Sequence, residues 1–277
     1  MTTEPDLLAD PAGKQKIYAF NSTVLYLLAY FIVYSLQQVI TILMARFNHI
    51  PAELFPGHID FKIPDKAWQV SDVVSTYGAG PFACLILGFA ATIIFNKIKH
   101  LGGIRKLFYL WLSLHSFNLF FGGLVAGTIA RSGFWYAVRW SIPSDAATLG
   151  IAIVFGLLML LIGFLAAPGF LISCDSITLI QFVNRRKLLL SMVIIPWLAG
   201  NLLLLLLKLP DLNMYDGFLA LTMLLILAPA YFFNLGNPIS ETVEEPRKTH
   251  FAFGLGIGLI LLLLVFRLGL QNGISFG

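Results

Sequence analysis

Charged residues are scarce in this chain of 277 residues: Asp, Glu, Lys and Arg make up 12%, whereas hydrophobic residues make up 58%. Soluble domains contain about 25% charged residues, because their surface must face water. The mean hydropathy of +0.85 points the same way. This composition excludes a water-soluble globular domain, and a lipid bilayer is the expected solvent.

Cysteine is also rare. Cys84 and Cys174 both lie at or within apolar runs, so they do not form the disulfide framework of a small secreted domain. The five histidines show no spacing typical of a metal site. The basic pI of about 9.1 reflects Lys and Arg between the apolar runs, where these residues report membrane topology. We expect no nucleic-acid partner, no metal and no cofactor.

Seven stretches lack Asp, Glu, Lys and Arg and are each at least 18 residues long. A helix needs roughly 20 apolar residues to cross a hydrocarbon core of about 30 Å. Lipid cannot satisfy free backbone groups, which favours helices over open sheets. The sequence therefore predicts an all-α fold, a polytopic membrane helix bundle forming one domain over residues 1–277. The expected transmembrane helices are 20–45, 73–96, 107–131, 148–173, 188–207, 217–236 and 250–267.

The distribution of basic residues predicts the orientation. One side of the membrane receives eleven of them: Lys14, Lys16, Lys97, Lys99, Arg105, Lys106, Arg185, Arg186, Lys187, Arg247 and Lys248. The other side receives seven: Arg46, Lys62, Lys66, Arg131, Arg139, Lys208 and Arg267. The positive-inside rule then predicts a cytoplasmic N-terminus and an external C-terminus.

Two connections are longer than turns. Residues 46–72 contain prolines with apolar residues between them, and two interpretations stay open: a re-entrant or interfacial segment, or an ordinary extramembrane loop. Residues 131–145 contain Phe134, Trp135, Tyr136 and Trp140, which is typical of an interfacial aromatic belt.

Polar side chains within the apolar runs require a reason, because they are costly in hydrocarbon. The first span contains Gln37 and Gln38. On the third, Trp111, His115, Asn118 and Gly122 have the spacing of one helix face. One interpretation is a polar binding pocket formed by His115, Asn118, Gln37 and Gln38. The other is interhelical hydrogen bonding, which is favoured for Asn201 and Asn234 of the fifth and sixth spans.

Small residues on the third span predict close packing. Gly123 and Gly127 form a G-x-x-x-G pair beside Gly122, and Gly254 and Gly258 repeat this spacing on the last span. If the bundle buries both the polar and the glycine stripe, the third helix must be central. No span carries a charge at its centre, which disfavours proton-coupled and ion-coupled carriers.

Three segments resemble the site-2 protease family of intramembrane zinc metalloproteases. The family carries H-E-x-x-H, then A-G-P-x-x-N, then N-x-x-P-x-x-x-L-D-G on successive helices. Gln37–Thr41 stands at the first motif, Ala79–Cys84 at the second, and Asn118–Gly127 at the third. The resemblance covers about 90 residues, from the first to the third span, and does not reach the last four helices.

The reactive positions depart from that family. Its two zinc-binding histidines, its aspartate and its general-base glutamate correspond here to Gln37, Thr41, Ala126 and Gln38. Cys84 stands where the family has the asparagine after A-G-P. The neutral amides of Gln37 and Gln38 and the methyl group of Ala126 cannot hold a catalytic zinc ion or accept a proton at neutral pH. In addition, the family places the loop after its zinc helix in the cytoplasm, whereas the charge distribution places residues 46–72 outside.

The resemblance implies a degenerate, non-catalytic relative, a pseudoenzyme without catalytic or metal-binding residues. We expect such a protein to bind a lipid or another transmembrane segment of a membrane protein. An alternative is a small-molecule or lipid transporter that uses the polar face of the third helix. A third is a membrane enzyme with active groups in its loops, such as His49, His58 and Asp60.

Overall fold

The computed structural model describes residues 11–210, 212–236 and 250–276. Within them, seven helices are long and apolar enough to cross a membrane, so the chain is a multi-pass helical membrane protein. Arg247 and Lys248, which contributed to the predicted orientation, lie outside the described residues.

Seven long apolar helices match the expected spans, and their ends differ from the predicted ones by up to nine residues. The first two are α1 (Pro11–Phe47) and α2 (Val70–Ile98). The third joins α3 (Arg105–Phe117), a π-helical turn η2 (Asn118–Gly122) and α4 (Gly123–Ala130). The fourth is α6 (Asp145–Ile172). The fifth runs from α8 (Phe182–Leu189) through the π-helical turn η3 (Leu190–Ile194) to α9 (Ile195–Lys208). The last two are α10 (Met214–Gly236) and α11 (Phe253–Leu270), while α5 (Phe134–Ser141) and α7 (Ile177–Ile180) are short connecting helices.

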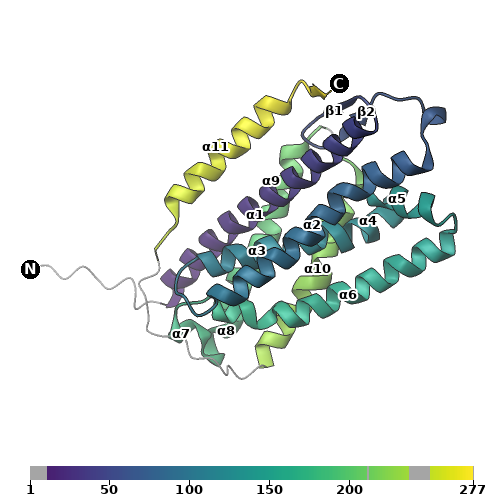
Figure 1. Ribbon diagram of the computed structural model, residues 1–277. Coiled ribbons are helices and arrows are strands. Elements are labelled where there is room, and N and C mark those ends of the chain that lie inside the picture. The colour runs from purple at the N-terminus through teal and green to yellow at the C-terminus, as the bar shows by residue number, and fades with distance from the viewer. Residues whose placement is uncertain (1–10, 211, 237–249, 277) are drawn as a thin grey trace, which may run out of the picture.

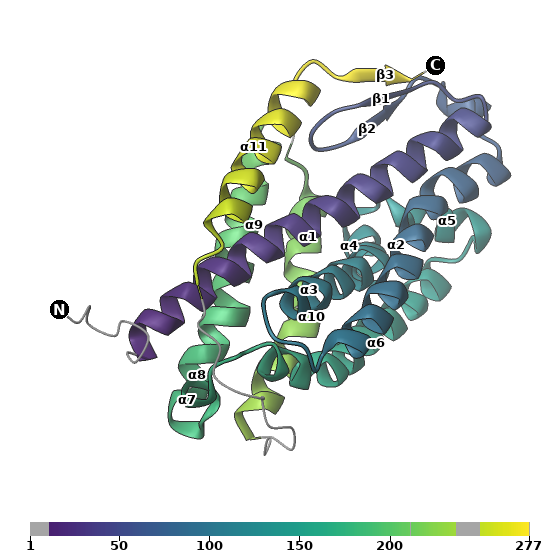
Figure 2. The ribbon, with the colours of Figure 1, turned by 60° about the vertical axis from the view of Figure 1, so that its left-hand side comes forward.

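The third span lies at the centre of the bundle, as its two stripes suggested. Of an apolar stretch of 18 residues in this span, 78% is buried inside the bundle, against 11% of the corresponding stretch in α11. Lipid-facing spans keep apolar side chains on their outer surface, whereas the third span packs against α1, α2, α6 and α10. Figures 1 and 2 show α3 and α4 inside the bundle and α11 along its edge.

The connection 46–72 folds into a small sheet and not into a re-entrant helical hairpin. Strands β1 (Ala52–Leu54) and β2 (Ile59–Phe61) pair antiparallel, and β3 (Ile274–Phe276) adds to the other edge of β1. Figure 2 shows this sheet at the end of the bundle where α1 and α11 finish. A short helical turn, η1 (Asp65–Ala67), then leads into α2.

The polar stripe of the third span contacts two neighbouring helices. Trp111 and His115 contact Tyr26 of α1, whereas Asn118 turns toward α10. The π-helical turn that begins at Asn118 alters the helical repeat within this stripe. On α11, a side chain at Gly254 or Gly258 would meet nothing within 4 Å in the described structure, so this pair packs no neighbour there.

Replacing Gly127 by alanine should destabilise the protein by about 1–3 kcal/mol, the usual cost of overpacking. The added methyl would lie 2.6 Å from the Ser132 carbonyl oxygen and 3.2 Å from the Trp135 backbone nitrogen. Gly123→Ala is the matched control, since its methyl would meet only the Tyr215 hydroxyl at 3.2 Å. Thermal unfolding in detergent measures both, and equal melting temperatures for the two variants would contradict this packing.

The predicted orientation is tested by labelling cysteines placed at Gly102 and Pro143, in connections between helices. Cys84 and Cys174 are fully buried, and burial raises the pKa of the Cys174 thiol to about 11, so little reactive thiolate forms there. Gly102→Cys should react in intact cells only with membrane-permeant reagents, and Pro143→Cys also with impermeant ones. The opposite pattern would reverse the orientation.

Candidate functional site

A buried ion pair lies where α9 meets α10. The ammonium of Lys208 donates to Asp216 Oδ1 at 2.6 Å, and the two side chains are only 6% and 5% exposed. The local sequence favours this placement, since Lys208 is in the last turn of α9 and Asp216 in the first turn of α10. Each charge therefore complements its helix dipole. Asn213 caps α10 by accepting the Asp216 backbone N–H at 3.0 Å.

Tyrosines of α1 cover the ion pair. The Lys208 ammonium lies 4.6 Å from the ring centroid of Tyr34 and 6.0 Å from that of Tyr30, within cation–π range. The two rings stack with centroids 5.5 Å apart, as expected for residues one helical turn apart. The Tyr34 hydroxyl donates to the Pro56 carbonyl oxygen at 3.0 Å, which ties α1 to the loop between β1 and β2.

An open polar cavity of about 270 Å³ lies beside the ion pair, at the end of the bundle that carries the sheet. Gln37 and Gln38, both predicted as binding residues, line it together with Thr41. Its remaining polar lining includes His58, Tyr77, Tyr136, Lys208 and Asp216. A concave site with several convergent polar groups is the usual form of a ligand-binding site.

His115 and Asn118 line a different cavity. It measures about 20 Å³, room for one water molecule, and lies deeper in the bundle with Tyr26 and Asn201 in its wall. His115 is buried, and its Nε2 atom has no hydrogen-bond partner among the described residues. The four predicted binding residues therefore fall into two pairs in two cavities.

The ion pair separates the two cavities. Lys208, Asp216 and Leu219 line both of them. Asp216 also has one carboxylate oxygen, Oδ2, without a partner in the described part of the chain. The charged pair thus lies between the cavity lined by Gln37 and Gln38 and the cavity lined by His115 and Asn118. Sequence reasoning had placed these four residues in one pocket.

The other intramembrane amides serve packing. Asn118 donates to the Leu219 carbonyl oxygen at 3.1 Å and accepts from the Thr222 hydroxyl at 3.0 Å. Asn234 donates to the Ala167 carbonyl oxygen at 2.6 Å, joining α10 to α6. Asn201 donates to the Tyr26 hydroxyl at 3.0 Å and also lines the small cavity.

Of the loop residues considered for an enzyme, His58 and Asp60 lie near each other. His58 lies 3.9 Å from Asp60 and stacks on Phe55, and of these loop residues only His58 lines the open cavity. His49 is exposed at the end of α1, where it adopts a left-handed backbone conformation. Among the described residues, no group of three or more His, Cys, Asp or Glu is arranged to hold a metal ion.

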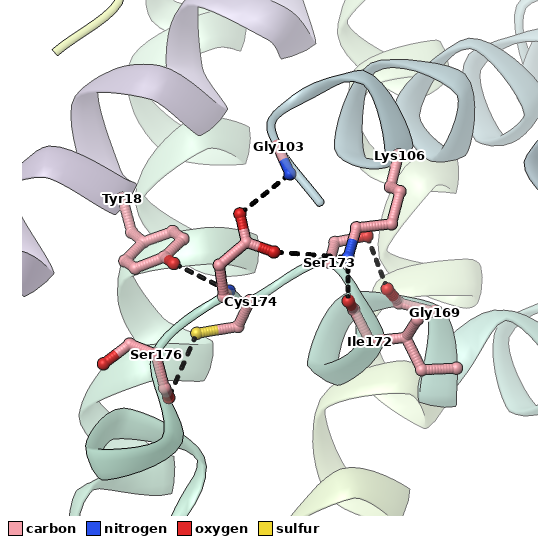
Figure 3. A network of polar contacts seen from close by, with 9 residues as sticks. Tyr18, Gly103, Lys106, Gly169, Ile172, Ser173, Cys174 and Ser176 are labelled. Carbon is pink, nitrogen blue, oxygen red and sulfur yellow. Dashed lines mark hydrogen bonds and ion pairs between the residues drawn. The ribbon is translucent and has the colours of Figure 1, made fainter. Parts of the chain in front are cut away.

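A second buried ion pair lies at the opposite end of the bundle (Figure 3). The Lys106 ammonium contacts Asp175 Oδ1 at 3.3 Å and donates to the Ile172 carbonyl oxygen at 2.8 Å. The Gly103 backbone N–H donates to Asp175 Oδ2 at 2.9 Å. With both carboxylate oxygens of Asp175 bonded, this network holds the α2–α3 connection against the end of α6, and neither Lys106 nor Asp175 lines either polar cavity.

Lys208, Asp216, Tyr30 and Tyr34 were missed by the sequence reasoning. The two charges flank the turn between the fifth and sixth apolar runs, where they resemble ordinary loop charges. One signal was available: tyrosines four residues apart on a single face of the first span. No protein-family model, curated protein or solved structure matches this chain.

Proposed function

We propose that this membrane protein is non-catalytic and binds the polar headgroup of a lipid in the open cavity. The observation that carries the proposal is the buried Lys208–Asp216 pair in the cavity wall. Burying two charges costs several kcal/mol per ion, so such a pair is weak evidence of stabilisation. A pair of opposite charges beside tyrosines and glutamines offers donors, acceptors and aromatic faces to a phosphate-containing headgroup.

The resemblance to site-2 proteases supports a non-catalytic role. Gln37 and Thr41 stand at the family's zinc ligands, and Gln38 stands at its general base; all three line the open cavity. The second motif packs against the first, because a side chain at Gly80 would meet Gln37 and Thr41. Ala126, at the aspartate position, is buried and does not line this cavity, which weakens the correspondence for the third motif.

Soluble headgroups without acyl chains test the proposal. We expect glycerophosphocholine, glycerophosphoethanolamine or glycerophosphoglycerol to raise the melting temperature of the purified protein. A ligand at one hundred times its Kd stabilises by about 2.7 kcal/mol. Gln37→Leu/Gln38→Leu should abolish the shift, while Ser35→Leu, an exposed residue of the same helix outside the cavity, should keep it. No shift with any headgroup would refute the proposed function.

Zinc content tests the non-catalytic part separately. Gln37, Gln38, Thr41 and Ala126 offer no thiolate, imidazole or carboxylate, the usual zinc ligands. The purified protein should therefore contain well under one zinc per chain by elemental analysis and should not cleave transmembrane substrates. Stoichiometric zinc that is lost on replacing His58 or His115 would reveal a site built differently from that of the protease family.

A transporter is the second candidate, and one observation favours it. The open cavity shares Lys208, Asp216 and Leu219 with the small cavity near the bundle centre, so polar groups extend inward from the open end. Flux of a headgroup that binds the protein, measured into proteoliposomes and compared with protein-free vesicles, separates transport from binding alone.

A further inference from the structure

A groove on the outer surface of the bundle lies apart from both polar cavities. It has a volume of about 260 Å³ and runs between α2 and α6, with α3 as its floor. Phe89, Phe117 and Leu165 make its wall mainly apolar. Thr92 and Ser113 also line it, and their hydroxyl oxygens lie 2.7 Å apart, so these two polar groups satisfy each other and leave the groove suited to hydrocarbon.

The groove is confined to one half of the membrane. It extends on α2 from Phe89 to Asn96, which at 1.5 Å per residue is about 10 Å. One leaflet contributes about 15 Å of the hydrocarbon core. A transmembrane helix would need a groove along the whole core, whereas an acyl chain of one leaflet fits this length.

The end of the groove lies near the membrane surface. Its last residues there are Asn96 and Gly169, two residues before the end of α2 and three before the end of α6. The adjoining segment 97–105 contains Lys97, Lys99, His100 and Arg105 and no acidic residue. Lys97 and Arg105 are exposed, and the nearby Asp175 is already engaged by Lys106. Among the described residues, Lys97 and Arg105 therefore make the mouth of the groove positively charged.

We propose that this groove binds one anionic phospholipid, with an acyl chain between α2 and α6 and the phosphate at the basic segment 97–105. The acyl chain fills the apolar groove, and the basic residues select the charge of the headgroup. Lysines and arginines near a membrane surface attract anionic lipid by about 1 kcal/mol each. This site is separate from the polar cavity, and it does not depend on the function proposed for that cavity.

Native mass spectrometry of the purified full chain tests the proposal with dioleoyl phosphatidylglycerol and dioleoyl phosphatidylcholine. We expect one tightly bound phosphatidylglycerol, with at least tenfold higher affinity than for phosphatidylcholine. Lys97→Gln/Arg105→Gln should remove most of this preference and leave phosphatidylcholine binding unchanged. Arg46→Gln/Lys66→Gln, exposed residues near the opposite end, are the matched control and should keep the preference.

A second variant tests the groove itself. Ala166→Phe places a ring in the groove and should weaken both lipids, whereas Ile153→Phe, an exposed position on the same helix outside the groove, should weaken neither. Equal affinity of the parent protein for the two lipids would overturn the proposal. Unchanged phosphatidylglycerol binding by Lys97→Gln/Arg105→Gln would also overturn it, as would a protein dimer that displaces the lipid. Lys97→Gln/Arg105→Gln alters only exposed residues, so the test remains decisive if Ala166→Phe does not fold.

Discussion

Lys208→Met should lower the free energy of unfolding by about 3–5 kcal/mol, the usual effect of leaving one member of a buried ion pair without its partner. Asp216 is buried, with 6% of its surface exposed. Its Oδ1 atom accepts a hydrogen bond from the Lys208 ammonium at 2.6 Å. Without Lys208, no Lys or Arg among the described residues of the cavity wall neutralises this carboxylate. Denaturation in mixed micelles, followed by tryptophan fluorescence, measures the loss.

The double variant Lys208→Met/Asp216→Leu is the control for this result. Replacing both members of a buried pair by apolar residues of similar size is often neutral or stabilising. We therefore expect the double variant to recover most of the lost stability while losing the headgroup-induced shift in melting temperature. A double variant as unstable as the single one would mean that the pair itself holds α9 to α10.

Gly163→Ala should cost about 3 kcal/mol, the upper end of the range for overpacking. The added methyl would collide with the backbone of α10, since it would contact the Ile226 carbonyl oxygen and lie 2.9 Å from the carbonyl carbon. A backbone cannot rotate away as a side chain can, so α6 and α10 would have to separate. Thermal unfolding in detergent should show a clearly lowered melting temperature.

Gly156→Ala is the matched control on the same helix. Its methyl would meet only Leu225 Cδ1 at 3.9 Å, an ordinary contact. Alanine is favoured over glycine in a helix by up to about 1 kcal/mol, so this variant should be neutral or slightly more stable. If both replacements lowered the melting temperature alike, the close approach of α6 and α10 at Gly163 would be wrong.

The spans were predictable because the bilayer imposes one strong rule. A run such as 148–173, free of charge and longer than the hydrocarbon core requires, has few alternatives to a helix. The central position of the third span was also predictable, since His115 and Asn118 are costly in lipid unless other helices cover them. Both inferences depend on residues close together in the chain.

The candidate site was harder to predict because it depends on contacts between distant residues. Lys208 and Asp216 are buried by Tyr30 and Tyr34, which lie on a helix far away in sequence. Pattern alone cannot distinguish such charges from those of a solvated loop. Likewise, Gln37 and His115 were assigned to one pocket because both are polar, whereas their side chains line cavities on opposite sides of the ion pair.

The small sheet has a consequence for the order of folding. Glu53 of β1 and Ser275 of β3 are 222 residues apart in the chain, and α11 immediately precedes β3. Closing so long a loop costs entropy that neighbouring helices do not incur when they pair. Asn21 meanwhile anchors the start of α11 through the His250 carbonyl oxygen and the Ala252 N–H. Helix pairs can thus assemble as they emerge, whereas β3 can join β1 only after all seven spans have been synthesised.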